Sequence, residues 1–288
     1  MVVGGVKCGT TSLYYYMQSH PEICAPCKES YLFTPELNQE TTASAKRYSL
    51  DEYMSLFKKS VTDQTRAAGE ISSIYLYCHE EVIPEIKRLL GDIKIIIVLR
   101  NPVGRAFSHY SFFARDVRDE RTFEDAVNEE LNGQAIPRPR HYLKMGLYSH
   151  QLKAYLDNFS TVKVILFDDL VADPDKTMRD IYTFLGVNPD LGGSTDKVYN
   201  ASGMPRVKWL QSLVFKPTPL KMKIRGFIVN RLIREERFAQ WMEWARKKNM
   251  KKAALSPDMK KRLTAYYRED IQALESLLGK DLSVWKDP

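Results

Sequence analysis

Short runs of β-branched and other apolar residues alternate with stretches of helical periodicity along this chain. The clearest run, residues 93–99, reads Ile-Lys-Ile-Ile-Ile-Val-Leu and is typical of a buried strand. A second clear strand is predicted at residues 162–167, and shorter extended pieces are predicted at residues 2–3, 31–33 and 67–71. Because strands and helices alternate, the pattern predicts an α/β fold with a mainly parallel sheet flanked by helices.

The predicted helices are marked by residues that commonly begin and end helices. Pro102 lies at a favourable first helical position, and Asp173-Pro174 forms a similar start before a later helix. Gly186 and Gly279 stand where helices commonly end in a left-handed conformation. Helices are expected at residues 11–19, 50–59, 84–90, 102–115, 122–131, 148–159, 174–185 and 257–278.

With 288 residues, of which 44% are apolar, the chain is long enough to bury a sizeable core. We expect a single domain over residues 1–288, with its core in residues 1–206 and 253–288. A helical, basic insertion is expected at about 207–252. No apolar run is long enough to span a bilayer, and no secretory signal precedes the first motif, so a cytoplasmic location is expected unless the amino terminus is trimmed.

The four cysteines do not form the pattern of a disulfide framework in a chain of this length. Cys24 and Cys27 have the Cys-x-x-Cys spacing, but no second pair follows and His20 is the only histidine nearby. We therefore expect neither a metal site nor a redox site at these cysteines.

The formal net charge of +7 favours anionic ligands such as nucleotides, acidic polymers or membrane surfaces. The excess is concentrated in residues 216–252, which contain twelve lysines and arginines and three glutamates. Two interpretations stay open for this stretch: a solvated helical face, or a surface for an acidic partner or a peripheral membrane contact.

The motif Gly-Gly-Val-Lys-Cys-Gly-Thr-Thr-Ser-Leu, which begins at Gly4, predicts a phosphate-binding loop. Gly4, Gly5 and Gly9 permit tight turns and close approach of the backbone to a ligand. The helix that follows presents its unpaired N–H groups to an anion. In P-loop nucleotide triphosphatases a lysine directly follows the second glycine. Here Thr10 stands at that position, and Lys7 lies inside the loop.

A lysine inside the loop can reach both a bridging oxygen and the group being transferred. A transferred sulfuryl group carries about one formal charge less than a terminal phosphoryl group, which weakens the case for a Mg²⁺ clamp. The loop resembles the 5′-phosphosulfate loop of sulfotransferases that use 3′-phosphoadenosine-5′-phosphosulfate (PAPS). The resemblance implies a catalytic role for Lys7 and no requirement for a metal. It also implies that the donor is bound by Lys7, Cys8, Gly9, Thr10, Thr11 and Ser12.

A second anion-binding motif follows the clearest strand. Arg100 ends that strand, where open parallel sheets bind ligands, and Ser108 lies about two helical turns further on. Arg-Asn-Pro-x-x-Arg-Ala-x-Ser-His-Tyr resembles the 3′-phosphate motif of carbohydrate-type sulfotransferases, which include the heparan sulfate enzymes and related bacterial ones. The resemblance implies that Arg100 and Ser108 hold the 3′-phosphate. Arg206 is either a further contact or a solvent-exposed arginine. Arg105 is either another contact or a structural arginine, and Asn101 is a candidate helix cap.

Three residues are candidates for the catalytic base. The sequence Lys-Glu-Ser-Tyr-Leu-Phe around Glu29 resembles the Lys-Glu-x-x-Phe-Phe stretch of the heparan sulfate enzymes, in which the glutamate is the base. His109 is the rival because it adjoins the 3′-phosphate motif and histidine titrates near neutrality. Glu70 is the third candidate, in a segment where Ile71 replaces the lysine of the family pattern.

The leading hypothesis is a PAPS-dependent sulfotransferase of the carbohydrate or heparan sulfate type, with 3′-phosphoadenosine-5′-phosphate (PAP) as product. The resemblance covers residues 2–206 and 256–285 and implies a P-loop-type sheet and an acceptor that is a carbohydrate, a lipid or a small or carrier-tethered metabolite. One alternative is a P-loop kinase that uses ATP and Mg²⁺, with Asp168-Asp169 as the magnesium candidates. The other is a basic polyanion-binding protein that uses residues 216–252. The sequence leaves the acceptor and the oligomeric state open, and nucleic acid is not an expected partner.

Overall fold

The computed structural model of this chain describes residues 1–34, 47–115, 118–195, 204–205, 250–251 and 254–287. Nearly all of the predicted insertion at about 207–252 lies outside these residues, as does Arg206. The single-domain organisation therefore stays a prediction.

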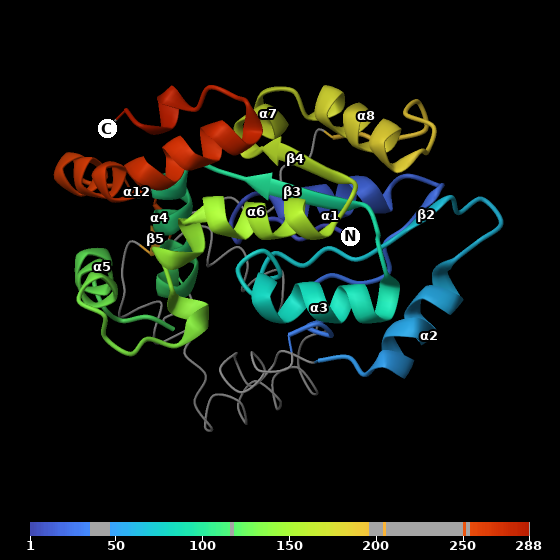
Figure 1. The fold of residues 1–288 in the computed structure, drawn as a ribbon, viewed down its shortest axis with the longest axis horizontal. Helices are drawn as coiled ribbons and strands as arrows, with labels where there is room; N and C mark the ends of the chain where they lie inside the picture. The colour runs from blue at the N-terminus through green and yellow to red at the C-terminus, as the bar shows by residue number, and fades with distance from the viewer. Residues whose placement is uncertain (35–46, 116–117, 196–203, 206–249, 252–253, 288) are drawn as a thin grey trace, which may run out of the picture.

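Short parallel strands lie at the centre of the molecule (Figure 1). β3 (Ile95–Leu99) pairs in parallel with β4 (Val162–Leu166), in register from the first residue of each strand to the last. β1 (Ile23–Cys24) pairs in parallel with β2 (Ala67–Ala68). The predicted α/β class with parallel strands is thereby confirmed.

Single parallel bridges join these two strand pairs. Val2 bridges Ile71, which follows β2, and also Ile96 within β3. Lys28, which follows β1, bridges Ile71 as well. The amino terminus therefore lies between the two pairs. A separate antiparallel pair is formed by β5 (Met204–Pro205) and β6 (Met250–Lys251).

The helices lie close to their predicted positions. Gly186 and Gly279 follow two of them in the predicted left-handed conformation. The α-helices are α1 (Thr10–Gln18), α2 (Leu50–Ser60), α3 (His79–Leu90), α4 (Pro102–Arg115), α5 (Phe123–Leu131), α6 (Tyr148–Asn158), α7 (Phe167–Ala172), α8 (Pro174–Leu185) and α12 (Pro257–Leu278). The 3₁₀ helices are η2 (Arg138–Arg140), η3 (Lys144–Gly146) and η4 (Ser283–Trp285).

Local capping explains why several helices begin where they do. Ser49 and Glu52 form a reciprocal capping box before α2, and Thr122 and Asp125 form another before α5. The Asn101 side chain accepts hydrogen bonds from two backbone N–H groups in the first turn of α4, as predicted for a cap. These short-range signals are readable from the sequence because both partners lie within three residues of each other.

Four local predictions were wrong. The strand predicted at residues 67–71 is limited to Ala67–Ala68, and Ile71 forms only single bridges. Residues 31–33 form a turn rather than an extended piece, because Tyr31 has a positive φ of 54°. α3 begins at His79, upstream of its predicted start. The strand predicted to reach Phe167 ends one residue earlier, and α7 begins there with Asp168 and Asp169 in its first turn, where carboxylates favour a helix amino terminus.

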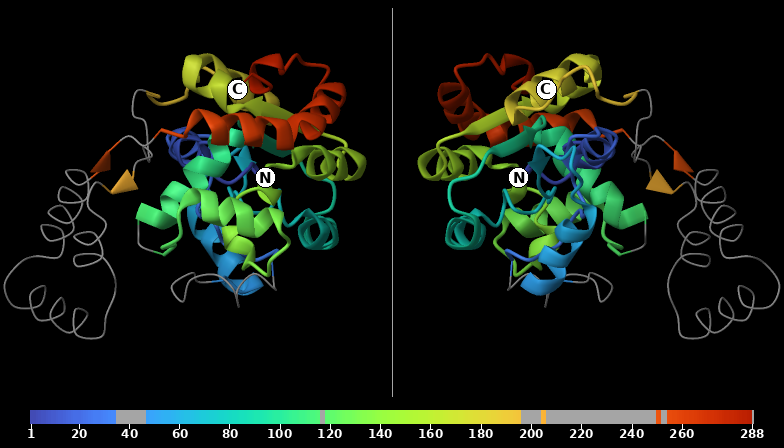
Figure 2. Two further views of the ribbon diagram at one scale, coloured as in Figure 1. Left: turned by 90° about the vertical axis from the view of Figure 1, so that its left-hand side faces the viewer. Right: turned by 90° about the vertical axis from the view of Figure 1, so that its right-hand side faces the viewer.

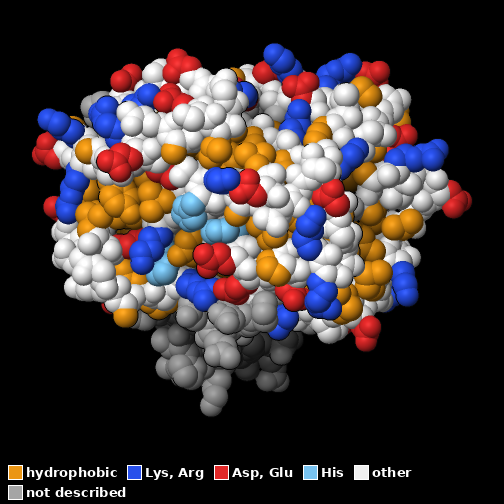
Figure 3. Space-filling view, viewed as in Figure 1, with side chains coloured by type: hydrophobic (Ala, Val, Ile, Leu, Met, Phe, Trp, Pro, Cys, Tyr) orange, Lys and Arg blue, Asp and Glu red, His pale blue; other side chains and the backbone are white. Residues whose placement is uncertain are grey.

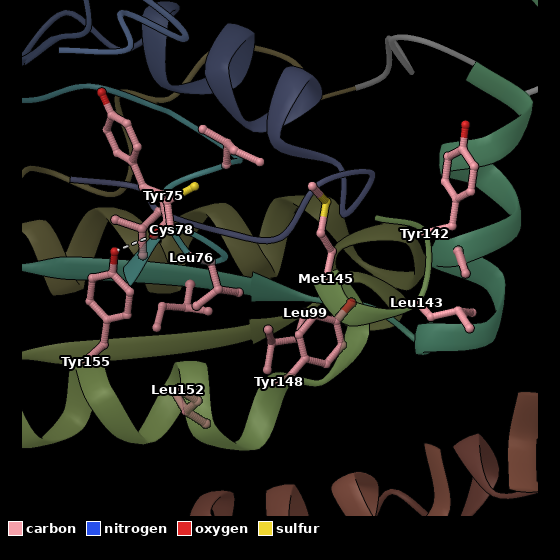
Figure 4. Packing of buried hydrophobic residues seen from close by; sticks show 14 of the residues in the cluster. Tyr75, Leu76, Cys78, Leu99, Tyr142, Leu143, Met145, Tyr148, Leu152 and Tyr155 are labelled. Atoms are coloured by element: carbon pink, nitrogen blue, oxygen red, sulfur yellow. Dashed lines mark hydrogen bonds between the residues drawn. The ribbon is translucent and has the colours of Figure 1, made fainter. Parts of the chain in front are cut away.

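Two apolar layers form the core, one on each face of β3. Ile95, Ile97 and Leu99 pack toward α3, α4, α6 and α12, whereas Ile96 and Val98 pack toward α1, α7 and α8. Figure 4 shows part of the first layer, in which Leu99 lies beside Tyr148 of α6, and Tyr155 of α6 lies near Tyr75 and donates to its carbonyl. The strand is buried on both faces, which explains its nearly continuous apolar sequence.

α12 closes the first layer and also caps α6. The yellow α8 and the red α12 lie at the same end of the molecule in both side views (Figure 2). The Asp270 carboxylate accepts hydrogen bonds from the backbone N–H groups of Tyr148 (2.7 Å) and Ser149 (3.1 Å) and from the Ser149 hydroxyl (2.5 Å). The carboxylate thus supplies partners for the amino terminus of a helix more than one hundred residues earlier.

Acidic and basic side chains are interspersed over the face seen in Figure 1, without a patch of one sign (Figure 3). Among the described helices, none is both long enough and apolar enough to cross a membrane.

We expect Asp270→Ala to lower the free energy of unfolding by about 2 kcal/mol, because three donors at the start of α6 lose a charged acceptor. Urea denaturation followed by circular dichroism measures the change. Glu269→Ala is the matched control, since this neighbouring carboxylate is exposed. Equal stability of the two variants would contradict the proposed capping role.

Candidate functional site

The glycine-rich loop lies directly on the carboxyl end of β3. The Gly5 N–H donates to the Val98 carbonyl at 2.9 Å. A Cβ atom at Gly4 would lie 2.7 Å from the Val98 nitrogen, and one at Gly9 would lie 3.0 Å from the Phe167 ring. Gly9 also has a φ of +88°, which side chains disfavour. Packing against Val98 and Phe167 therefore requires glycine at positions 4 and 9, and the expected close approach to a ligand stays a prediction.

The amino terminus of α1 is available to an anion. α1 begins at Thr10, directly after Gly9, and no side chain caps it. When no side chain caps a helix, its dipole and its first N–H groups attract an anion. Thr11 and Ser12 are half-buried in this first turn, whereas the Cys8 side chain is buried with its sulfur 3.7 Å from the Tyr148 hydroxyl. Burial raises the pKa of Cys8 to about 11, so the thiol is neutral.

Lys7 occupies a strained and electropositive position. Its φ is 68°, in the left-handed region. Its ammonium lies 4.6 Å from the centroid of the Phe112 ring on α4. Burial lowers the pKa of Lys7 to about 8, with further contributions from the positive charges of Arg115, Arg100 and Lys28.

Arg100 joins the two predicted anion-binding motifs. Its guanidinium donates to the backbone carbonyl of Lys7 at 3.1 Å and lies 4.5 Å from the centroid of the Phe167 ring. Ser108 is two turns along α4 and is 5% exposed. The structure thus brings the loop of Lys7 into direct contact with Arg100, directly after β3.

Two further cations, which the sequence analysis did not identify as site residues, lie against the Phe112 ring. The guanidinium of Arg115 lies 4.9 Å from the Phe112 centroid and that of Arg118 lies 4.8 Å from it. A cation over an aromatic face is stabilised by the ring quadrupole. Arg115 follows Ser108 by seven residues, or two helical turns. The helical period of α4 therefore indicated that Arg115 lies on the same face as Ser108.

Glu29 is held by four hydrogen bonds. Its carboxylate accepts from the Lys28 ammonium (3.0 Å), from the Ser72 hydroxyl (2.9 Å) and from the Ser73 N–H (3.1 Å) and hydroxyl (2.8 Å). Burial raises the pKa of Glu29, but the Lys28 charge and the Ser73 hydrogen bonds outweigh it, so the pKa is lowered. The Lys28 ammonium, which pairs with Glu29, also contributes to the lowered pKa of Lys7.

The other two base candidates are enclosed. His109 is 3% exposed, and its ring lies 5.4 Å from that of Phe113 and 5.2 Å from that of Tyr142, between centroids. Burial and the charge of Arg105 hold its pKa well below the usual value, so the ring is neutral. Glu70 is 1% exposed and faces the interior, and burial raises its pKa.

Arg105 proves to be a buried arginine. It is fully shielded from solvent and donates to the Tyr142 carbonyl, with a second nitrogen 3.5 Å from His109 Nδ1. Its burial favours the structural interpretation, and no local pattern in the sequence indicated it. Among the described residues, no group of three or more His, Cys, Asp or Glu side chains is arranged to hold a metal ion.

Comparison with known proteins agrees with this geometry. The model of the sulfotransferase domain family matches residues 1–275. The chain belongs to this family. A crystal structure of a sulfotransferase from Alicyclobacillus acidocaldarius superposes with a TM-score of 0.73 at 29% identity, covering 99% of this chain and 97% of the other.

Curated relatives match the chain over a shorter range. A mouse bifunctional heparan sulfate N-deacetylase/N-sulfotransferase 4 is 27% identical over 203 residues, which are 66% of this chain and 22% of the relative. A mouse heparan sulfate glucosamine 3-O-sulfotransferase 3B1 is 25% identical over 213 residues, which are 72% of this chain and 51% of the relative. The matched regions therefore span about half or less of these relatives.

We expect the Lys7 ammonium to titrate near pH 8. Its charge should be present at pH 7 and largely lost by pH 9, because burial and neighbouring cations disfavour the protonated form. Side-chain ¹⁵N NMR across this pH range measures the titration, with a Lys7→Arg variant to assign the signal. Lys153, exposed on α6, is the internal reference. A Lys7 ammonium that keeps its charge at pH 9.5 would contradict this electrostatic description.

Proposed function

We propose that this protein transfers a sulfuryl group from PAPS to a hydroxyl or amine of an acceptor and releases PAP. The observation that carries the proposal is the hydrogen bond between Arg100 and the Lys7 carbonyl, which ties a phosphate-binding loop to a second basic site at the end of β3. Membership of the sulfotransferase domain family supports the same reaction. The bridges through Val2 support a P-loop-type parallel sheet that carries both sites.

The two sites would hold opposite ends of one nucleotide. The N–H groups at the start of α1, with the hydroxyls of Thr10, Thr11 and Ser12, would hold the 5′-phosphosulfate. The missing Cβ atoms at Gly4 and Gly9 let the loop pack tightly on Val98 and Phe167, which would hold the loop backbone in place for the ligand. The Cys8 thiol is turned into the core, so Cys8 contributes through its backbone.

The 3′-phosphate would be held by Arg100 and Ser108. A guanidinium grips a phosphate with two parallel hydrogen bonds, and the Ser108 hydroxyl adds a donor from α4. A contact from Arg206 remains a prediction, because that residue lies outside the described part of the chain.

Catalysis would use Glu29 and Lys7. Glu29 accepts the proton of the acceptor hydroxyl or amine as its oxygen or nitrogen attacks the sulfur. The bond between sulfur and the bridging 5′-phosphate oxygen breaks, and the Lys7 ammonium neutralises the charge that develops on that oxygen. The lowered pKa keeps Glu29 ionised at neutral pH, as a base requires. The enclosed ring of His109 favours a packing role instead.

The kinase alternative has weaker support. Asp168, a candidate magnesium ligand, accepts a hydrogen bond from the Trp285 indole at 3.1 Å, and Asp169 lies 4.0 Å from the Lys280 ammonium. An ammonium at Lys7 supplies the charge neutralisation that a kinase obtains from Mg²⁺. We propose that no metal is required. The acceptor, the cytoplasmic location and an acidic or membrane partner for residues 216–252 remain predictions.

We expect Arg100→Ala to weaken PAP binding by roughly 10- to 100-fold, because a charge-assisted pair of hydrogen bonds to the 3′-phosphate is lost. Isothermal titration calorimetry with PAP measures the change. Arg88→Ala is the control, since this exposed arginine pairs with Glu85 far from the loop in sequence. Unchanged affinity in Arg100→Ala, or tight binding of ATP that depends on Mg²⁺, would argue against the proposed donor site.

We expect Glu29→Gln to leave the PAP affinity within about twofold of wild type and to slow turnover by about 10²- to 10⁴-fold, the usual contribution of a general base. Release of PAP from PAPS is measured with N-desulfated heparan sulfate and p-nitrophenol as trial acceptors. Glu22→Gln is a control carboxylate from the same part of the chain. Wild-type turnover in Glu29→Gln would transfer the role of base to another group.

A further inference from the structure

Backbone strain is concentrated in the candidate site. In the described part of the chain, three non-glycine residues have a positive φ: Lys7 (68°), Glu29 (56°) and Tyr31 (54°). The left-handed region is unfavourable for residues with a Cβ atom, and such residues persist where surrounding contacts hold them. Two of the three flank Ser30, so the contacts of Ser30 decide how this strained segment is held.

Ser30 is fixed by both its backbone and its side chain. Its N–H donates to Glu70 Oε1 at 3.0 Å. Its hydroxyl lies 3.1 Å from the Tyr75 hydroxyl and accepts from the Leu32 N–H at 3.2 Å. Tyr75 donates its proton to the same Glu70 oxygen at 3.1 Å, so the Ser30 hydroxyl is the donor toward Tyr75. Glu70 Oε1 is the terminal acceptor of this network.

Glu70 is an unusual residue to find at such a position. It is 1% exposed, and its second oxygen, Oε2, has no hydrogen-bond partner among the described residues. Burying a carboxyl group without full compensation opposes folding. The hydrogen bonds from the Ser30 N–H and the Tyr75 hydroxyl to Oε1 are therefore what holds this carboxyl group in place.

The residues that follow Glu70 hold Glu29 from the other side. The Ile71 carbonyl accepts from the Glu29 N–H at 3.0 Å. Ser72 and Ser73 donate to the Glu29 carboxylate. One short segment, residues 70–73, thus contacts the backbone N–H groups of Glu29 and Ser30 and the Glu29 carboxylate.

We propose that Glu70 is a positioning residue: through Ser30 and Tyr75 it fixes the left-handed turn at residues 29–31 and thereby aims the Glu29 carboxylate at the acceptor. This inference rests on the proposed role of Glu29 as base. Glu70 itself is enclosed and turned toward Ser30, so it acts through Glu29 and does not reach the acceptor.

The test combines substitutions at both glutamates. Glu70→Gln keeps an oxygen for Ser30 and Tyr75, whereas Glu70→Leu removes the acceptor at similar volume. Each is made alone and together with Glu29→Gln. PAP affinity is measured by calorimetry, and turnover by release of PAP from PAPS with N-desulfated heparan sulfate or p-nitrophenol, or with water as acceptor where neither accelerates release.

We expect Glu70→Gln to turn over within about threefold of wild type, and Glu70→Leu to lose about tenfold or more in kcat with PAP affinity within about twofold. In the Glu29→Gln background, Glu70→Leu should change kcat by less than about twofold, because residues that act as a unit are not additive. An equal loss in both backgrounds, a parallel loss of PAP affinity, or unchanged kcat would overturn the inference.

Two further readouts keep the outcome decisive. If Glu70→Leu does not fold, Tyr75→Phe removes one hydroxyl of the network, and it should slow kcat by about threefold or more with Glu29 present and have little effect in Glu29→Gln. Unchanged kcat in Tyr75→Phe would then overturn the inference. Failure of the proposed function gives a different result: wild-type protein that binds no PAP, or Glu29→Gln that turns over normally.

Discussion

The close contact between the glycine-rich loop and β3 is the constraint on which the site depends. Without Cβ atoms at Gly4 and Gly5, the loop backbone packs against Val98 and turns back over the end of the strand. That turn places the Lys7 carbonyl where Arg100, at the end of the same strand, can donate to it. One strand therefore determines the separation of the two basic sites, and packing on both of its faces keeps that separation rigid.

The charges gathered at this edge oppose one another in the absence of an anion. Arg115, Arg100 and Lys28 all lower the pKa of Lys7, and the Phe112 ring offers only partial compensation. Like charges held together by a rigid scaffold cost stability, and an anionic ligand relieves this repulsion when it binds. Folding thus pays the cost of bringing these charges together, and a bound anion recovers part of it as binding free energy. Functional sites commonly reduce stability in this way.

The sequence predicted the parts of the fold and site whose signals are local. β3, α4 and the loop around Lys7 could be predicted because strand pattern, Pro102 and glycine spacing each lie within a few residues. The turn at Tyr31 could not, because its positive φ depends on Glu70, about forty residues away. The burial of Arg105 was equally invisible, since its partner is a backbone carbonyl at Tyr142. The helical period of α4 placed Arg115 on the same face as Ser108, but an arginine that is merely exposed on that face would have the same spacing.

Two glutamates on neighbouring segments illustrate how environment separates chemical roles. Glu29 accepts from an ammonium and from hydroxyl and N–H donors, which lower its pKa, whereas Glu70 is buried among tyrosines and its pKa is raised. Pairs of carboxyl groups whose surroundings move their pKa values apart are a recurrent basis for dividing proton transfer from structural support. The ionised Glu29 pairs with Lys28, and the enclosed Glu70 accepts from the Ser30 N–H. The segments of Glu29 and Glu70 are joined through Ile71, so a shift of one backbone moves the other. The strain of the turn at residues 29–31 is thereby coupled to the orientation of the Glu29 carboxylate.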